Sequence, residues 1–295
     1  MFGIGAYEIT LLTTMGIAIT VALSLNLITG FCGQISLGHA AFYGIGAYCA
    51  ALMTKAGYPF AFAVVSGAVL STVFGLIVGL ASLRVRDDFL AITTMGAGFL
   101  FLGVVGQWDF VGGEMGVAGI PDTGLGKPAF MGLTLLIAGL TIIYSLYLKR
   151  SWLGFVFDAV AADEDTARVL GLNVSRYKLV AFAMGTAIAG VAGALYAHHI
   201  RFIDPDSFGF IESVSILSMV VIGGIGSVWG VVFAAIVLSL LPQWFQFIDD
   251  YKLLVYGGLL FFVMRFSPGG VAEISQKLWS RLRQLKSSPV AGAPE

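Results

Sequence analysis

The sequence predicts an all-α membrane protein, a bundle of helices that crosses the bilayer several times. Of its 295 residues, 58% are hydrophobic and only 11% are charged, whereas about 25% of the residues of a soluble domain are charged. The mean hydropathy is +0.93. The apolar residues form runs of about 20, the length that a helix needs to cross a bilayer, and short polar or Pro/Gly breaks separate these runs.

These runs predict a polytopic bundle of about nine spans, and the breaks allow about eight to ten. Glycine and proline interrupt the segment 211–247, so one of its pieces is a candidate re-entrant segment. We take 1–272 as one transmembrane domain and 273–295 as a cytoplasmic tail whose end we expect to be disordered. The predicted spans are residues 8–29, 36–54, 59–83, 89–106, 128–148, 178–197, 211–227, 229–247 and 252–266.

Basic residues predict the orientation, because Lys and Arg concentrate in short cytoplasmic loops. They gather near 84–86, between 149 and 178, and in the tail segment 276–286, whereas the intervening loops hold few of them. With nine spans, this pattern places the N-terminus outside and the C-terminus in the cytoplasm.

Charge and cysteine usage exclude several classes of protein. The 16 Lys and Arg residues nearly balance the 17 Asp and Glu residues, so we expect neither nucleic-acid binding nor a polybasic membrane-surface patch. Cys32 and Cys49 lie in apolar sequence without metal-ligand spacing, and we interpret them as buried small side chains. We expect no metal site, because the adjacent His198 and His199 would point in different directions on a helix.

Small residues recur at every fourth position in two predicted spans, which lets helices approach each other closely. We expect a close helix contact at each. The first set is Ser36, Ala40 and Gly44. The second set is Gly185, Ala189, Gly193 and Ala197.

The first of these segments also carries polar side chains just inside the membrane, at Gln34, Ser36 and His39. Polar groups are costly in lipid, so we expect them to face protein, where they are candidates for lining a solute path. The alternative is a hydrogen bond between helices, which we favour for His39. Glycine breaks at 30–38 and 223–230 resemble each other, and paired glycine-broken segments often mark a transport path.

The longest predicted cytoplasmic loop, 149–178, contains a short helix at about 163–171. Acidic residues at 163–165 suit the start of a helix, and Gly171 suits its C-terminal end. Its function is open at this point: a helix that only joins two spans would show the same pattern.

Several motifs resemble known transport proteins. "DTARVLG" (165–171) resembles the cytoplasmic signature of ABC-importer permeases, although Thr166 stands where alanine is preferred. "GQISLGHAAFYGIGAY" (33–48), the segments 171–197 and 220–235, and "YGGLLFFVMRFSPGGV" (256–271) closely resemble the LivM/LivH family, the membrane subunits of branched-chain amino-acid ABC importers. The resemblance covers about 20–272, and a LivM-like member fits best.

This resemblance implies an ABC-importer permease in the bacterial inner membrane. Its implied partners are a second permease, two ATPase subunits and a periplasmic solute-binding protein. Related permeases serve urea, short amides, nucleosides and sugars, so these substrates remain alternatives to branched-chain or other apolar amino acids. The helix at 163–171 would contact the ATPase through Asp165, Ala167, Arg168 and Gly171.

We expect this chain to be a transport subunit that is not an enzyme and that binds no cofactor. "GLGKP" (124–128) lacks the spacing of a phosphate-binding loop, so the partner ATPase would bind ATP and Mg. Two other functions are less well supported by the sequence. An ion-coupled carrier would place ion ligands near mid-membrane, whereas the acidic residues here cluster in loops or at span ends. A membrane enzyme would need a convergent set of catalytic residues, and we find none in the sequence. In the outer loop 111–121, Glu114 and Met115 replace the smaller polar pair typical of the family, and a change of binding partner is one interpretation.

Overall fold

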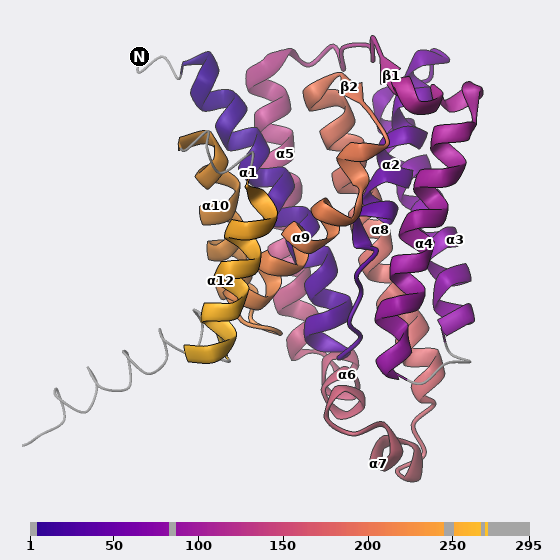
Figure 1. Ribbon diagram of the computed structural model, residues 1–295, viewed down its shortest axis with the longest axis vertical. Helices are drawn as coiled ribbons and strands as arrows, with labels where there is room; N and C mark the ends of the chain where they lie inside the picture. The colour runs from indigo at the N-terminus through magenta and orange to yellow at the C-terminus, as the bar shows by residue number, and fades with distance from the viewer. Residues whose placement is uncertain (1–4, 83–86, 245–250, 267–268, 271–295) are drawn as a thin grey trace, which may run out of the picture.

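The computed structural model describes residues 5–82, 87–244, 251–266 and 269–270, which form a bundle of helices (Figure 1). All nine predicted spans overlap helices. The bundle helices are α1 (Ala6–Leu25), α2 (His39–Lys55), α3 (Phe60–Ser82), α4 (Asp87–Gln107), α5 (Gly126–Arg150), α8 (Val174–Ile200), α9 (Phe210–Gly223), α10 (Val228–Trp244) and α12 (Lys252–Phe266).

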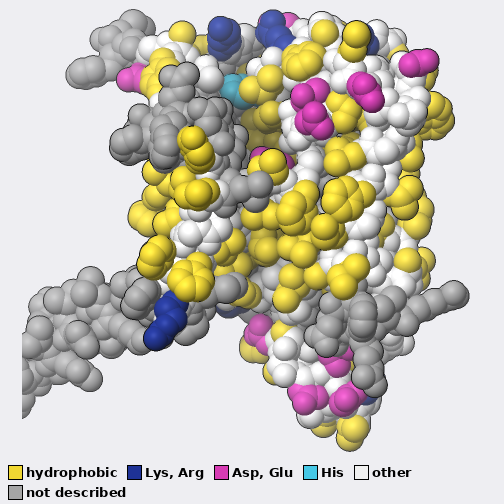
Figure 2. Space-filling view, in the orientation of Figure 1, with side chains coloured by type: hydrophobic (Ala, Val, Ile, Leu, Met, Phe, Trp, Pro, Cys, Tyr) yellow, Lys and Arg dark blue, Asp and Glu magenta, His cyan; other side chains and the backbone are white. Residues whose placement is uncertain are grey.

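The all-α membrane architecture is confirmed. Among the described residues, 6 helices are long and apolar enough to cross a membrane. The other predicted spans correspond to the shorter α2, α10 and α12, so the count of nine crossings stays a prediction. Figure 2 shows hydrophobic side chains over the middle of the bundle and charged side chains gathered towards its two ends, as a bilayer requires.

The expected stripe of Ser36, Ala40 and Gly44 is wrong, because α2 begins only at His39. A π-helix at Asn26–Phe31 extends α1, and the chain then runs upward inside the bundle before α2 begins (Figure 1). In this segment the Leu37 N–H donates to Thr94 Oγ1 of α4 at 3.0 Å. An α4 side chain therefore satisfies a backbone group that a helix would have paired internally.

The neighbours of Gly44 also differ from the prediction of a close contact between helix backbones. A methyl group there would lie 2.7 Å from Phe101 Cζ and 2.9 Å from Phe208 Cγ. Gly44 therefore makes room for aromatic side chains, and the close backbone contacts of α2 lie elsewhere.

Those contacts join α2, α3 and α8, which we call the glycine-packed group. A methyl group at Gly46 would overlap the carbonyl of Gly190, and one at Gly193 would overlap the carbonyl of Tyr43. A methyl at Gly190 would lie 2.7 Å from the carbonyl oxygen of Gly67 on α3. The close helix contact predicted at Gly193 is therefore present, and Gly46, Gly67 and Gly190 extend it.

The other predicted small residues are buried as well. A methyl at Gly185 would lie 2.7 Å from the Ser24 carbonyl oxygen, so this glycine brings α8 against α1. Ala40 and Ala189 have no exposed surface. A larger side chain at any of these positions would have to displace a neighbouring helix.

Below the bundle in Figure 1, α6 (Trp152–Ala162) and α7 (Glu164–Val169) form a protrusion between α5 and α8. The helix expected at about 163–171 is confirmed as α7, while α6 was not predicted. Asp163 caps α7, its side chain accepting from the Thr166 N–H at 2.7 Å. This hydrogen bond and others in the same turn hold the pKa of Asp163 below its usual range.

At the opposite end, β1 (Val117–Ala118) pairs antiparallel with β2 (Phe202–Ile203). The short helices η2 (Asp109–Val111), η3 (Gly113–Met115) and η4 (Asp206–Phe208) flank these strands. Arg201 Nη2 lies 2.6 Å from Asp122 Oδ2 and holds the pKa of that carboxyl below its usual range. The loops 108–125 and 201–209, which we predicted to lie on the same side of the membrane, thus lie at the same end of the molecule. The tail 273–295 lies outside the described residues.

Candidate functional site

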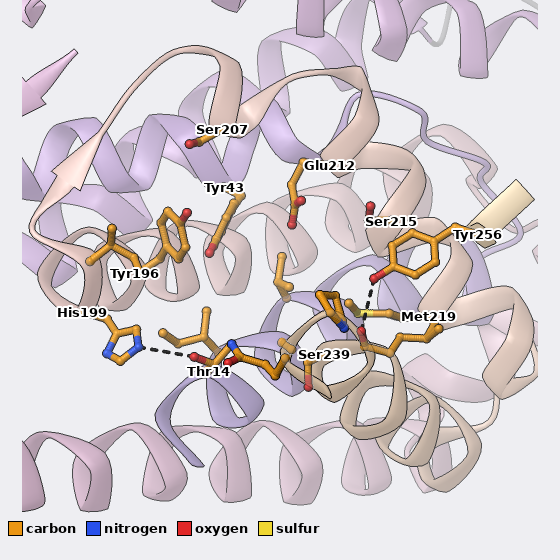
Figure 3. Close-up of a pocket in the computed structure, with 17 residues that line it drawn as sticks. Thr14, Tyr43, Tyr196, His199, Ser207, Glu212, Ser215, Met219, Ser239 and Tyr256 are labelled. Atoms are coloured by element: carbon orange, nitrogen blue, oxygen red, sulfur yellow. Dashed lines mark hydrogen bonds between the residues drawn. The ribbon is translucent and has the colours of Figure 1, made fainter. Parts of the chain in front are cut away.

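A cavity of about 530 Å³ lies among α1, α2, α8, α9, α10 and α12 (Figure 3). Small-molecule sites in proteins commonly occupy about 300–1,000 Å³. The described side chains that line it are mainly apolar and hydroxyl-bearing, with one carboxylate, Glu212. Its size and lining suit a small solute that is partly apolar.

One wall of the cavity gathers its polar groups. Tyr43 of α2, Tyr196 of α8 and Glu212 of α9 lie along this wall, with Ser207 of η4 beside them (Figure 3). The Tyr43 ring packs against Tyr196 and Phe208, with centroids 5.4 and 5.3 Å apart. Because Gly44 leaves the space that Phe208 occupies, this glycine helps to hold Tyr43 in place.

Apolar side chains cover much of the remaining surface. They come from three helices and are Ile17, Ala18, Val21, Met219 and Leu238. At the edge of this surface, Thr14 Oγ1 and His199 Nε2 are 3.3 Å apart (Figure 3). The cavity therefore presents both apolar and polar groups to a solute, and hydroxyl groups such as those of Ser215 and Ser239 lie among the apolar side chains.

The residues predicted to line a path do not line this cavity. Gln34, Ser36 and His39 are 4%, 0% and 0% exposed. Ser24 Oγ donates to the Val21 carbonyl oxygen at 2.6 Å, so it accepts from His39 Nε2 at 2.7 Å. His39 thus makes the interhelical hydrogen bond that we favoured for it. Any role of the three residues in the path stays a prediction.

The two predicted glycine breaks meet at the end of the bundle that carries α7. The Gly226 N–H donates to Asn26 Oδ1 at 3.0 Å, and a methyl at Gly30 would lie 2.6 Å from the same nitrogen. Lys149 donates to the Gly226 carbonyl oxygen. These contacts join the π-helix, an element often found at functional sites, to the loop between α9 and α10.

The residues predicted to contact the ATPase lie together on α7 and at its end, and their surroundings differ in part from the prediction. Arg168 contacts Glu164 at 3.0 Å and Asp165 at 2.7 Å, on the exposed side. Ala167 is 1% exposed, so it packs against the chain itself. Gly171 has φ +84°, the left-handed geometry expected of a residue that ends a helix.

Two residues were missed by the sequence reasoning. Lys178 of α8 forms an ion pair with Glu164, and both side chains are mostly buried. Glu212 lies at the start of a predicted span and was grouped with the acidic residues of the loops. Its position next to a long apolar run was the available signal, because a carboxylate there is costly without a function.

His198 and His199 do not converge. His198 Nδ1 lies 2.7 Å from the Ala194 carbonyl oxygen, whereas His199 faces Thr14. No group of three or more potential metal ligands occurs among the described residues.

Comparison with known proteins decides the family. The family model described as "Branched-chain amino acid transport system / permease component" matches residues 8–264. The chain belongs to this permease family. The match includes every helix that lines the cavity as well as the protruding α6 and α7, so both features belong to the permease.

Individual permeases agree with this assignment. The permease is 32% identical to LivM of Salmonella typhimurium, a high-affinity branched-chain amino acid transport system permease protein, over 92% of this chain and 71% of LivM. It is 32% identical to BraD of Pseudomonas aeruginosa, a permease of the same description, over 55% and 52% of the two chains. It is 29% identical to LsrC of Klebsiella pneumoniae, an autoinducer 2 import system permease protein, over 61% and 56%. No solved structure matches the permease.

Proposed function

We propose that this chain is the membrane subunit of an ATP-driven importer that moves branched-chain or other apolar amino acids across a bacterial inner membrane. The family match over residues 8–264 carries this proposal. The similarity to LivM along 92% of the chain supports the substrate class, and a cavity lined by both apolar and polar side chains suits a small amino acid.

The importer requires further subunits. A second permease would complete the membrane core, two ATPase subunits would bind ATP and Mg, and a periplasmic solute-binding protein would deliver the amino acid. The protrusion formed by α6 and α7 is the surface that we assign to the ATPase, because Val169 and Leu170 expose 88% and 73% of their surface there. Exposed apolar side chains of this kind commonly mark a protein contact.

A continuous structural link joins this surface to the cavity. Glu164 of α7 pairs with Lys178 at the start of α8. The 27 residues of α8 extend about 40 Å at 1.5 Å per residue, and its other end supplies Tyr196 and His199 to the cavity. Movement of α7 would thus be transmitted to the solute site through one rigid helix.

Reconstitution tests the proposal. The chain is co-expressed with its candidate partner permease and ATPases, and the complex is placed in proteoliposomes with the solute-binding protein. We expect uptake of radiolabelled leucine that requires ATP and stops when the ATPase is omitted. Uptake by this chain alone, driven by an ion gradient, would contradict the proposal. ATP-dependent uptake of radiolabelled urea or sugar, with no uptake of leucine, would replace the substrate class.

A further inference from the structure

The side of α1 that lines the cavity continues towards the end of the bundle that carries α7 (Figure 1). Thr14 and Ala18 line the cavity. Ala22 and Asn26 follow at the same spacing of four residues, which places them in turn along one side of the helix. Ala22 has no exposed surface, and Asn26 is 1% exposed. A solute that leaves the cavity along this side of α1 would therefore meet closed packing, at the end of which lies Asn26.

The loop between α9 and α10 is fixed at Asn26 by two side chains. The Gly226 N–H donates to Asn26 Oδ1 at 3.0 Å, and Lys149 Nζ of α5 donates to the Gly226 carbonyl oxygen. A methyl at Gly226 would lie 2.9 Å from the carbonyl oxygen of Gly30, so the loop lies directly on the π-helix. Both backbone polar groups of Gly226 are thus bound by side chains of other elements.

Asn26 is only half satisfied in this arrangement. Its Oδ1 accepts from Gly226, while its buried Nδ2 has no partner among the described residues. A buried donor without a partner costs free energy, which offsets much of what the hydrogen bond to Gly226 contributes. A conformation in which the loop withdraws and water reaches Asn26 would satisfy both of its polar groups. The closed contact is therefore only weakly favoured and can open.

The protrusion adjoins this contact at both ends of α6. Lys149 lies in the last turn of α5, directly before the start of α6 at Trp152. Near the other end of α6, a methyl at Gly33 would lie 3.0 Å from Ala161 Cα, and Gly33 comes shortly after the π-helix. Because α6 is a continuous helix of 11 residues, its displacement would shift Lys149 and the end of the π-helix relative to the loop.

We propose that Asn26 and Lys149 form a latch that closes the solute path at the end of the bundle that carries α7, and that displacement of α6 releases Gly226 and opens the path. This inference rests on the proposed function and adds the step at which the solute leaves the cavity. Gly224 and Gly226 have φ +102° and +78°, a geometry that favours glycine. The loop can therefore rearrange while α9 and α10 stay helical.

A thiol placed behind the latch reports whether the latch is open. Ala22→Cys is introduced with Cys32 and Cys49 replaced by alanine. The complex with its partner permease and ATPases is placed in lipid nanodiscs with the solute-binding protein and leucine. We expect a water-soluble maleimide to label position 22 slowly without ATP and several times faster during ATP hydrolysis, because each opening of the latch admits water to this side of α1.

Two substitutions on this background remove the latch contacts. Asn26→Leu keeps the size of the side chain and removes the acceptor, and we expect labelling without ATP to rise about tenfold, as the loss of one buried hydrogen bond implies. Lys149 is exposed, so Lys149→Met should fold and should raise the labelling by a smaller factor of about threefold.

Lys55→Met is the matched control. Lys55 also donates to a backbone carbonyl oxygen, that of Ala118 at 3.1 Å, at the opposite end of the bundle. Its loss removes the same kind of contact away from the latch and should leave the labelling of position 22 unchanged. Purified yield and melting temperature show whether each variant has folded.

The outcomes separate the latch from the proposed function. Labelling at the wild-type rate in a folded Asn26→Leu variant, or in Lys149→Met, overturns the latch. So does an equal rise in Lys55→Met, or labelling that ATP hydrolysis does not change in the complex with an intact latch; ATP-dependent uptake of leucine in that complex would leave the proposed function standing. The expected labelling pattern in a complex that shows no ATP-dependent uptake of leucine supports the latch and contradicts the proposed function.

Discussion

The two sides of the bundle both contain close glycine contacts, since a methyl at Gly223 of α9 would lie 2.5 Å from Val231 Cα of α10, but they differ in the space that their helices leave. In the glycine-packed group of α2, α3 and α8, backbones approach so closely that a single methyl group would overlap a neighbouring carbonyl at Gly46 and Gly193. On the other side lie α9, α10 and α12, which we call the cavity group, and a space of about 530 Å³ separates them from α1 and from the ends of α2 and α8 that carry Tyr43 and Tyr196. In Figure 1 the labels of α10 and α12 lie to the left of that of α1, and those of α2, α3 and α8 lie to its right.

This difference assigns a mechanical role to each side. Close-packed interiors transmit displacement and deform little, so the glycine-packed group is suited to move as one body. The ion pair between Lys178 and Glu164 attaches this group to α7. The cavity group has space to rearrange. We infer that ATP-driven motion enters through α7 and moves the glycine-packed group against the cavity group.

The largest effect is expected from Gly193→Leu, which tests whether the glycine-packed group tolerates any separation. The new side chain would meet the Tyr43 carbonyl and the Ala47 nitrogen, both of them backbone atoms. We expect destabilisation beyond the about 1–3 kcal/mol typical of an overpacked core, and hence little folded complex in detergent extracts.

Gly139→Leu on α5 is the matched control, because nothing lies within 4 Å of a methyl group at that position. Its yield and size-exclusion profile should equal those of the wild type. Normal assembly of Gly193→Leu would refute the role of this packing.

A smaller but functional effect is expected when the link between α7 and α8 is broken. Lys178→Met removes the ion pair that joins α7 to α8, while Glu164 keeps its contact with Arg168 within α7. We expect membrane insertion to persist while substrate-stimulated ATP hydrolysis falls at least about tenfold.

The double variant Glu164→Gln/Lys178→Met also lacks the ion pair between α7 and α8, so its stimulated hydrolysis should be as low as that of Lys178→Met. Stimulated hydrolysis at the wild-type level in Lys178→Met would mean that motion reaches the bundle by another connection. We would then expect the contact with the ATPase in the cytoplasmic segment 83–88, of which 83–86 lie outside the described residues.

His39→Ala should have a moderate effect that falls on assembly. His39 donates to Ser24 and has no exposed surface, so its loss removes a buried hydrogen bond and leaves a void at the start of α2. We expect the yield of complex to fall about threefold or more, as a loss of roughly 1 kcal/mol implies, while uptake per assembled complex changes little. The opposite pattern, normal yield with poor uptake, would place His39 in the solute path.

The smallest effect concerns pH and the cap of α7. Since the pKa of Asp163 is lowered in the folded chain, its contribution to stability is present above the unfolded pKa of about 3.9 and is lost as the pH falls through the lower folded value. Hydrogen exchange of the α7 peptide, corrected for intrinsic rates, should show protection declining below about pH 4. Asp163→Asn retains a capping side chain and should lack this decline; an equal decline in both proteins would contradict the assignment.

The sequence predicted the helices well because hydrophobic run length is a strong local signal. It also predicted α7, because Asp163 and Gly171 mark the helix ends through their own side-chain and backbone chemistry. The late start of α2 could not be predicted from local sequence. The segment 33–38 is not helical, and Thr94, which is distant in sequence, satisfies the Leu37 N–H. The glycine partners and the ion pair of Lys178 likewise depend on which helices become neighbours, which spacing within one helix does not encode.

The measurement that tests the account most directly is a pair of spin-label distances in the assembled importer, with Cys32 and Cys49 replaced by alanine. Labels at the exposed positions Tyr58 and Leu254 span the two groups, and labels at Tyr58 and Ile200 lie at the ends of glycine-packed helices. On addition of ATP, we predict that the distance between 58 and 254 changes by more than the width of its distribution, while the distance between 58 and 200 stays constant. A change of the 58–200 distance, or constancy of both distances during active uptake, would contradict the movement of one packed body against the other.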